Sequence, residues 1–312
     1  MNIQFGWRVP DFPVDRSSSK EFNNQLLHYM DVIQGHLPTA WVADHFFPWL
    51  DRQDQATATF EALTTLTYFL GRYPQMRLGS IVLCQSYRNP ALLAKMAATL
   101  QTLSEGRFIL GLGAGWKENE YLAYGYAYPS AVTRLEQLEE AVQIIRRMWT
   151  EPAATFHGKH YHIENAYCAP KPDPIPPLMI GGGGKKITLR LVAQYADWWN
   201  VPNCDPNEYR DLLAILKSHC QRLGRNYDNI LKTWSTECVA VAADPSAAER
   251  IAKASPFYDS KGAIVGTPEQ VATQIQRFVD LGVRHFMFRF ADFPRTQGVE
   301  FFIKELLPRF AA

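Results

Sequence analysis

Eight strand-like segments, each followed by a helix-like segment, constrain the fold of this chain more than any other feature. Strands are expected near residues 3–9, 39–45, 77–83, 107–114, 177–181, 197–201, 231–242 and 284–290. Helical periodicity is found at 20–34, 56–71, 89–103, 133–149, 184–195, 206–223 and 268–281, and 298–310 closes the chain. This alternation predicts an α/β fold, a (β/α)8 TIM-like barrel that forms a single domain over residues 1–312. Two doubly wound domains are the alternative, but no linker-like change of composition divides the chain.

One proline-rich stretch, residues about 151–176, interrupts the alternation between the fourth helix and the fifth strand. Its segment TFHGKHYHI is expected to form a hairpin within an insertion. The segment holds His157, His160 and His162, but no carboxylate or cysteine stands at ligand spacing. We therefore predict no metal site.

Charge and cysteine usage exclude several classes of partner. The chain has 32 Lys and Arg against 31 Asp and Glu, which offers no electrostatic case for nucleic acid or an anionic membrane. No apolar run is long enough to cross a membrane, and the first residues do not resemble an export signal. Five scattered cysteines without a CxxC motif are typical of a reduced, cytoplasmic protein.

Polar residues at the carboxyl ends of barrel strands are the first candidates for a site. The second strand ends in Asp44 and His45, and the histidine could exchange a proton with a substrate. A histidine hydrogen-bonded to nearby backbone is an equally good interpretation of that position. In the third strand, Ser80 could contact a ligand edge, although a hydroxyl satisfied within the strand is the simpler interpretation.

Two glycine motifs follow the fourth and fifth strands. Gly111, Gly113 and Gly115 alternate, which favours the close approach of a ligand or another backbone. The motif GLGAG lacks the spacing and the acidic partner of a dinucleotide fingerprint, so we do not interpret it as one. Gly181–Gly184, followed by Lys185 and Lys186 at a helix start, indicate a phosphate cradle.

In combination, several motifs make the chain resemble the bacterial luciferase-like superfamily, in particular its branch of F420-dependent oxidoreductases. The motifs are WVADHF (41–46), YRNPALLAKMAATLQTLSEGRFILGLGAGWKENEY (87–121), TRLEQLEEA (133–141), PLMIGGGGKKITLRLVAQYADWWN (177–200) and GTPEQV (266–271). The resemblance implies a TIM-like barrel that binds the deazaflavin coenzyme F420, or alternatively FMN, and that forms a homodimer.

The resemblance also implies roles for individual residues. His45 and Trp49 match catalytic positions, and Trp7, Trp49 and Trp116 are expected to wall the substrate cleft. Ser80 and Ile81 match the site of a non-prolyl cis peptide bond behind the cofactor ring. The residues expected to bind the cofactor are Asp44, His45, Ser80, Ile81, Gly113, Asn119, Glu120, Gly181, Gly182, Gly183 and Gly184.

Two departures from the family pattern bear on function. Trp116 stands where the sugar-phosphate dehydrogenases of this branch have a catalytic glutamate, and Arg134-Leu135 replace the Arg-Tyr of the FMN branch. The first hypothesis is an oxidoreductase that transfers a hydride between F420 and a small organic substrate. The alternatives are an FMN-dependent monooxygenase that uses oxygen and takes reduced flavin from a partner reductase, and a non-catalytic flavin-binding protein. A flavin or F420 reductase is accordingly expected as a partner, depending on the cofactor.

Overall fold

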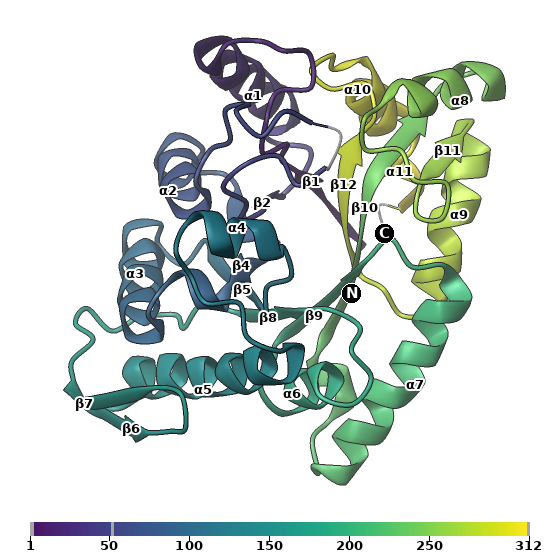
Figure 1. Ribbon diagram of the computed structural model, residues 1–312. Coiled ribbons are helices and arrows are strands. Elements are labelled where there is room, and N and C mark those ends of the chain that lie inside the picture. Colours follow the sequence, from purple (N-terminus) through teal and green to yellow (C-terminus); the bar gives the residue numbers. More distant parts are fainter. Residues whose placement is uncertain (1–2, 51–52, 311–312) are drawn as a thin grey trace.

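The protein is a closed barrel of parallel strands enclosed by helices, as the computed structural model of residues 3–50 and 53–310 shows (Figure 1). The barrel strands are β1 (Gln4–Arg8), β2 (Thr39–Val42), β3 (Arg77–Ser80), β5 (Phe108–Gly113), β8 (Leu178–Gly181), β9 (Trp198–Pro202), β10 (Leu231–Val241) and β12 (His285–Phe290). Pairing of β9 with β10 closes the ring, since β12 joins β10 to β1 at the other end of the chain. The predicted TIM-like barrel is therefore confirmed.

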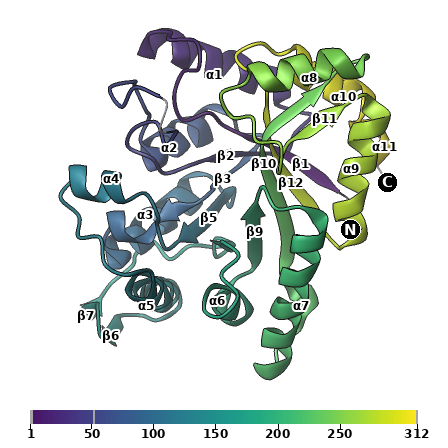
Figure 2. The same cartoon turned by 45° about the vertical axis from the view of Figure 1, so that its right-hand side comes forward.

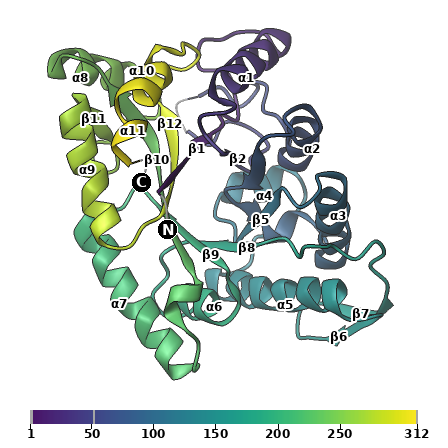
Figure 3. The same ribbon diagram turned by 180° about the vertical axis from the view of Figure 1, so that it is seen from behind.

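Helices follow the strands and lie outside the ring, as the view from behind also shows (Figure 3). They are α1 (Ser19–Ile33), α2 (Ala62–Arg72), α3 (Pro90–Leu103), α5 (Ala131–Thr150), α6 (Thr188–Tyr195), α7 (Pro206–Arg222), α9 (Pro268–Asp280), α10 (Gln297–Glu305) and α11 (Leu307–Phe310). Among the described residues, no helix is both long and apolar enough to cross a membrane.

Three helices begin at other residues than predicted, and capping side chains account for two of these starts. The fourth helix begins at Ala131, because Ser130 accepts the backbone N–H of Thr133; the expected start at residue 133 is wrong. The second helix begins only at Ala62, where the Glu61 carboxylate accepts two backbone N–H groups, rather than at residue 56. The fifth helix begins at Thr188 and not at residue 184.

Shorter elements elaborate the connections. The strand β4 (Leu83–Cys84) and the 3-10 turn η1 (Gln85–Tyr87) follow β3, and α4 (Glu118–Ala123) follows β5. The segment at about 243–266 forms α8 (Pro245–Ala254) and β11 (Ile264–Gly266), and β11 extends the sheet beside β10. A further 3-10 turn, η2 (Tyr227–Asn229), precedes β10.

An antiparallel hairpin, β6 (Ala154–His157) and β7 (His162–Ala166), lies beside α5, away from the barrel ring (Figure 2). Its histidines contact single carboxylates: His157 lies 2.8 Å from Glu164, and His160 lies 2.9 Å from Glu136. No cluster of three or more candidate metal ligands occurs in the part of the chain that the structure describes.

The barrel interior is filled at one end only. Trp41, Trp198 and Met287 form an apolar cluster inside the ring, with Ile109 and Met179 from the neighbouring strands. These residues occupy the middle and the amino ends of their strands. The larger apolar core lies outside, between the strands and the helices. This packing leaves the carboxyl end of the ring open to hold a site.

Candidate active site

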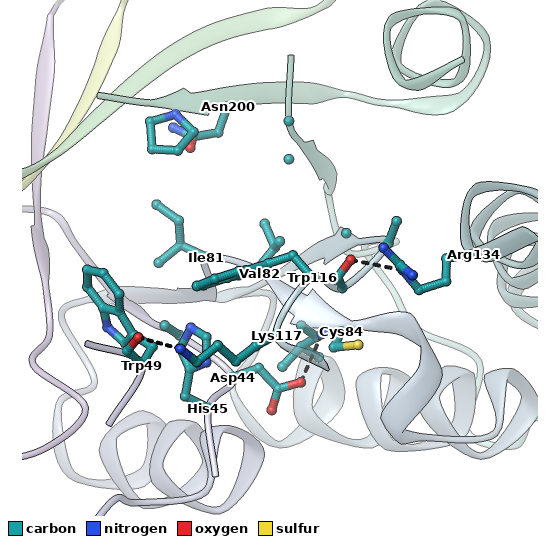
Figure 4. A pocket seen from close by; sticks show the side chains of 18 of the residues that line it. Asp44, His45, Trp49, Ile81, Val82, Cys84, Trp116, Lys117, Arg134 and Asn200 are labelled. Carbon is teal, nitrogen blue, oxygen red and sulfur yellow. Dashed lines mark hydrogen bonds between the residues drawn. The ribbon is translucent and has the colours of Figure 1, made fainter. Parts of the chain in front are cut away.

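A cavity of about 500 Å³ opens at the carboxyl end of the barrel (Figure 4). Its lining includes the last residues of four strands, namely Arg8, Gly113, Gly181 and Pro202, together with Glu237 from within β10. The loops after β2 and β3, together with α4 and α5, supply most of the remaining wall. The cavity therefore lies where enzymes of this barrel class place their chemistry.

His45 and Glu120 form a hydrogen-bonded pair in this wall. His45 Nδ1 lies 3.0 Å from Glu120 Oε2 and 3.1 Å from Oε1. The same carboxylate accepts the Phe46 backbone N–H at 2.9 Å and the Tyr87 hydroxyl at 3.2 Å. Burial raises the pKa of Tyr87 well above its ordinary value, so this phenol remains a donor.

The arrangement defines which nitrogen of His45 can react. Glu120 is fully surrounded by donors, with a side chain only 1% exposed, so its oxygens act as acceptors and Nδ1 carries the hydrogen. Nε2 of His45 has no hydrogen-bond partner among the described residues, and its side chain is 13% exposed at the cavity. In the neutral ring Nε2 is a proton acceptor. Sequence reasoning included Glu120, but as a cofactor contact and not as the partner of His45.

Asp44 lines the cavity, but its carboxylate is already engaged. Arg88 donates two hydrogen bonds to it, at 2.8 and 2.9 Å, and the Cys84 backbone N–H donates a third at 2.9 Å. Burial raises the pKa of Cys84 to about 11, so the thiol beside it stays protonated near neutral pH. Asp44 thus holds the loop after β3 against the end of β2.

The loop after β3 forms the floor of the cavity through Ile81 and Val82. The non-prolyl cis peptide bond joins these two residues, one position beyond the predicted Ser80–Ile81 bond. A Cβ at Gly113 would lie 2.7 Å from the Val82 side chain, and one at Gly111 would lie 2.0 Å from the Ser80 carbonyl oxygen. The missing side chains of these glycines therefore make room for atoms of the loop after β3. Close approach of another part of the chain was one of the two explanations for their alternation, and close approach of a ligand was the other.

The glycine loop after β8 contributes only its first half to the cavity. Gly181 and Gly182 line it, together with Thr188 at the start of α6 and Arg134 of α5. Gly182 has φ +120°, which favours glycine, and its N–H donates to the Asn200 carbonyl at 2.9 Å. The lining here thus includes the N-terminus of α6 and the guanidinium of Arg134, and both suit an anionic group.

Two indoles stand beside His45. The ring centroid of Trp49 lies 6.2 Å from that of the imidazole, and the centroid of Trp116 lies 5.9 Å from it. Trp116 is 58% exposed at the mouth, whereas Trp49 Nε1 is buried without a partner among the described residues. Trp7, in contrast, is fully buried and stacks on Tyr29 of α1, so its expected place in the cleft is wrong.

Four further predicted residues lie outside the described lining of the cavity: Ser80, Asn119, Gly183 and Gly184. The Ser80 hydroxyl donates to the Gly111 carbonyl and accepts the Gly111 N–H, both at 2.9 Å, as in the simpler interpretation. Asn119 is exposed on α4. Expectations for these residues relied on motif position, which does not determine where a side chain points.

Sequence reasoning missed a charged part of the cavity wall, formed by β1 and β10. Arg8 at the end of β1 forms an ion pair with Glu237 of β10, whose other oxygen lies 3.0 Å from Arg289. Arg289 also lies 3.3 Å from Asp11 and is completely buried. Burial lowers the pKa of Arg8, and the nearby Glu237 opposes that change. The sequence offered one signal for Arg8, because it lies near the carboxyl end of the first predicted strand, where site residues of this barrel class are found.

A closed parallel barrel with a histidine–carboxylate pair in its carboxyl-end cavity defines an enzyme of the TIM-barrel class. Within that class, the chain belongs to the luciferase-like monooxygenase family, whose model matches residues 37–262.

Known relatives and neighbours match nearly the whole chain. An F420-dependent glucose-6-phosphate dehydrogenase from Microbacterium testaceum (strain StLB037) is 27% identical over 326 residues, covering 94% of this chain and 96% of the relative. The protein with the same name from Mycobacterium avium (strain 104) is 26% identical over 328 residues, with coverage of 94% and 96%.

Two solved structures share the fold over nearly their full length. One is an F420-dependent secondary alcohol dehydrogenase in complex with an F420-acetone adduct, with a TM-score of 0.85, 21% identity and complete coverage of both chains. The other is the coenzyme F420-dependent tetrahydromethanopterin reductase from Methanopyrus kandleri, with a TM-score of 0.79, 17% identity and coverage of 99% and 100%.

Proposed function

We propose that this protein is an oxidoreductase that transfers a hydride between coenzyme F420 and a small organic substrate, in either direction. The observation that carries the proposal is the His45–Glu120 pair, which presents a free imidazole nitrogen to a cavity of about 500 Å³. The full-length similarity to F420-dependent dehydrogenases supports the choice of cofactor.

The cavity fits a flat ring with an anionic tail. Ile81 and Val82 offer an apolar floor, and Gly113 and Gly181 leave the space that Val82 needs there. A tail carrying phosphate would lie toward Gly182, beside Thr188 and Arg134. When bound, F420 supplies the carbon that gives or accepts the hydride.

The protein's own contribution is proton transfer and orientation. His45 Nε2 would take the hydroxyl proton of an alcohol as its carbon loses hydride, or return a proton to the carbonyl oxygen in the reverse direction. Glu120 keeps the hydrogen on Nδ1 and stabilises the imidazolium that forms. Trp49 and Trp116 flank the imidazole and would shield the reacting groups from water.

Fluorescence titration of the protein with F420 and, separately, with FMN tests this proposal. We expect saturable binding of F420, with much weaker binding of FMN and no oxygen consumption. Tight FMN binding accompanied by oxygen consumption would instead establish the monooxygenase. Binding of either cofactor without turnover of any alcohol, ketone or aldehyde would favour a binding protein. Light scattering measured alongside tests the expected homodimer.

A further inference from the structure

We propose that the Arg8–Glu237 ion pair is a second polar subsite of the cavity and that it binds a hydroxyl group of the substrate. The substrate is then an alcohol with two hydroxyl groups, or a hydroxy ketone in the reverse direction. One oxygen lies at His45 and the other at the ion pair. This inference rests on the proposed function, because it names the substrate class of the same site.

The two atoms that form the ion pair are the ones that a ligand can reach. Arg8 and Glu237 both line the cavity, with side chains 11% and 7% exposed. Nε and Nη1 of Arg8 and Oε2 of Glu237 are buried. The polar atoms that remain to meet a ligand are therefore Arg8 Nη2 and Glu237 Oε1, which contact each other.

A donor and an acceptor side by side suit a hydroxyl group. A guanidinium N–H only donates hydrogen bonds, and a carboxylate oxygen only accepts them. A hydroxyl can accept from Arg8 Nη2 and donate to Glu237 Oε1 at the same time. A carboxylate would gain the Arg8 contact but lie against the negative Glu237, and an ammonium group would meet the reverse conflict. The pair therefore favours a hydroxyl over either ion at this position.

Neighbouring charges hold the pair in place. Glu237 Oε2 lies 3.0 Å from Arg289 Nη1, and Arg289 Nη2 lies 3.3 Å from Asp11. The Arg289 side chain is completely buried, so it forms a fixed support for Glu237. The subsite is thus ordered before a substrate arrives, which lowers the cost of binding.

An irregularity in β10 accompanies the position of Glu237. The register of β10 with β12 shifts between Thr236 and Val239, a stretch that includes Glu237. Bulges of this kind re-aim side chains and are common beside active sites. Asn203 Oδ1 accepts the Glu237 backbone N–H at 3.3 Å. The Asn203 amide nitrogen has no hydrogen-bond partner among the described residues, so this lining residue offers a further donor.

A series of side-chain contacts leads from His45 to the ion pair. The ring centroids of His45 and Trp49 lie 6.2 Å apart, and Trp49 stacks on Phe257 with centroids 6.1 Å apart. The Arg289 guanidinium lies 4.1 Å from the Phe257 ring centroid and contacts Glu237. Both polar sites therefore belong to one connected group of side chains around one cavity, where a small substrate can lie against both.

The first experiment compares cyclohexanol with the three positional isomers of cyclohexanediol as reductants of F420 bound to the wild-type enzyme. Loss of the visible absorbance of F420 reports the reaction. We expect kcat/KM for at least one diol to exceed that for cyclohexanol by about 10-fold or more, because the second hydroxyl bonds to charged groups. Similar values for all four compounds would overturn the inference and leave the proposed function intact. Failure of F420 to bind would instead overturn the proposed function.

The second experiment measures binding of the same four compounds by calorimetric titration. The enzyme is loaded with reduced F420, which cannot accept a hydride from an alcohol, so binding is measured without turnover. The double variant Arg8→Met with Glu237→Met removes both polar atoms, while Arg289 keeps Asp11 as a partner. Its affinity for the tightest-binding diol should fall about 10-fold or more, toward that for cyclohexanol.

Arg190→Gln with Glu139→Gln is the matched control, because it removes an ion pair of the same composition between α6 and α5, outside the described lining. It should bind the diol as the wild type does. A loss of diol affinity in the Arg8–Glu237 variant alone would support the inference, whereas equal affinity of that variant and the wild type would overturn it. If the variant does not fold, the wild-type comparison of the diols with cyclohexanol decides.

Discussion

Two histidines inside the same barrel occupy opposite environments. His45 lies at the open carboxyl end, with Nδ1 held by Glu120 and Nε2 toward the cavity. His285, at the start of β12, is fully buried between Trp41 and Trp198, with Nε2 3.0 Å from the Thr39 hydroxyl. Burial, helped by the nearby Arg77, lowers the pKa of His285 to about 3.

The difference shows that the two ends of the barrel perform different tasks. A carboxylate beside His45 stabilises the charged ring, so that histidine can gain and lose a proton. The apolar surroundings of His285 exclude the charged ring, so that histidine remains neutral and contributes to packing. The predictions below test this contrast.

Replacing His45 should have the largest effect. His45→Ala removes the proton acceptor, so kcat should fall by about 100- to 10,000-fold while F420 affinity changes little. Steady-state kinetics and fluorescence titration measure the two quantities. The companion variant His285→Gln should retain wild-type kcat, and wild-type turnover by His45→Ala would remove the proposed role.

Replacing Glu120 should have the next largest effect. Glu120→Gln removes the negative charge beside Nδ1, and kcat should fall by about 10- to 100-fold, since a hydrogen bond to a charged group contributes about 1.5–3 kcal/mol. Tyr87→Phe is the control, because it removes one donor to Glu120 but leaves the carboxylate on His45. A loss of kcat equal in both variants would show that Glu120 acts only through packing.

The buried histidine should appear in the pH dependence of stability. The folded-state pKa of His285 lies below the unfolded value of about 6.5. Between these two pKa values, His285 binds a proton in the unfolded chain but not in the folded protein. The free energy of unfolding should therefore fall as pH drops from about 6.5 toward about 3. The slope is about 1.4 kcal/mol per pH unit for this one group.

Urea denaturation at several pH values in that window measures the effect. His285→Gln should flatten the curve, because glutamine does not titrate. An unchanged slope in the variant would mean that another group dominates the acid response.

The hairpin histidine should have the smallest effect. His157 is exposed beside Glu164, so His157→Ala should change the free energy of unfolding by only about 0–1 kcal/mol and leave kcat unaltered. Thermal unfolding and steady-state kinetics measure both. A large loss of either would show that the hairpin interacts with the barrel in a way that its contacts do not suggest.

Sequence periodicity was enough to predict the barrel, because strands buried on both sides and amphipathic helices leave a strong local pattern. It also placed Asp44, His45 and Gly181 near the carboxyl end, where the structure has them. Helix starts were less predictable: α5 begins at Ala131 rather than at residue 133, because Ser130 caps it, and apolar periodicity does not show where a capping residue ends the preceding loop.

The candidate site was only partly predictable, for a different reason. Glu120 lies 75 residues from His45 in the chain, and no local pattern connects them. Trp7 was assigned to the cleft by residue type, but β1 turns its side chain toward Tyr29 and the outer core. The pairing of Arg8 with Glu237 likewise depends on the closure of the ring through β10, β12 and β1.

The amino-acid sequence by itself determined the order of strands and helices and the family pattern, because these depend on local spacing of apolar residues and on short motifs. The tertiary structure alone decided which histidine can react and which is sealed, and which arginines are neutralised. Those properties depend on burial and on charges within a few ångströms, and distant parts of the chain supply both only after the barrel has closed.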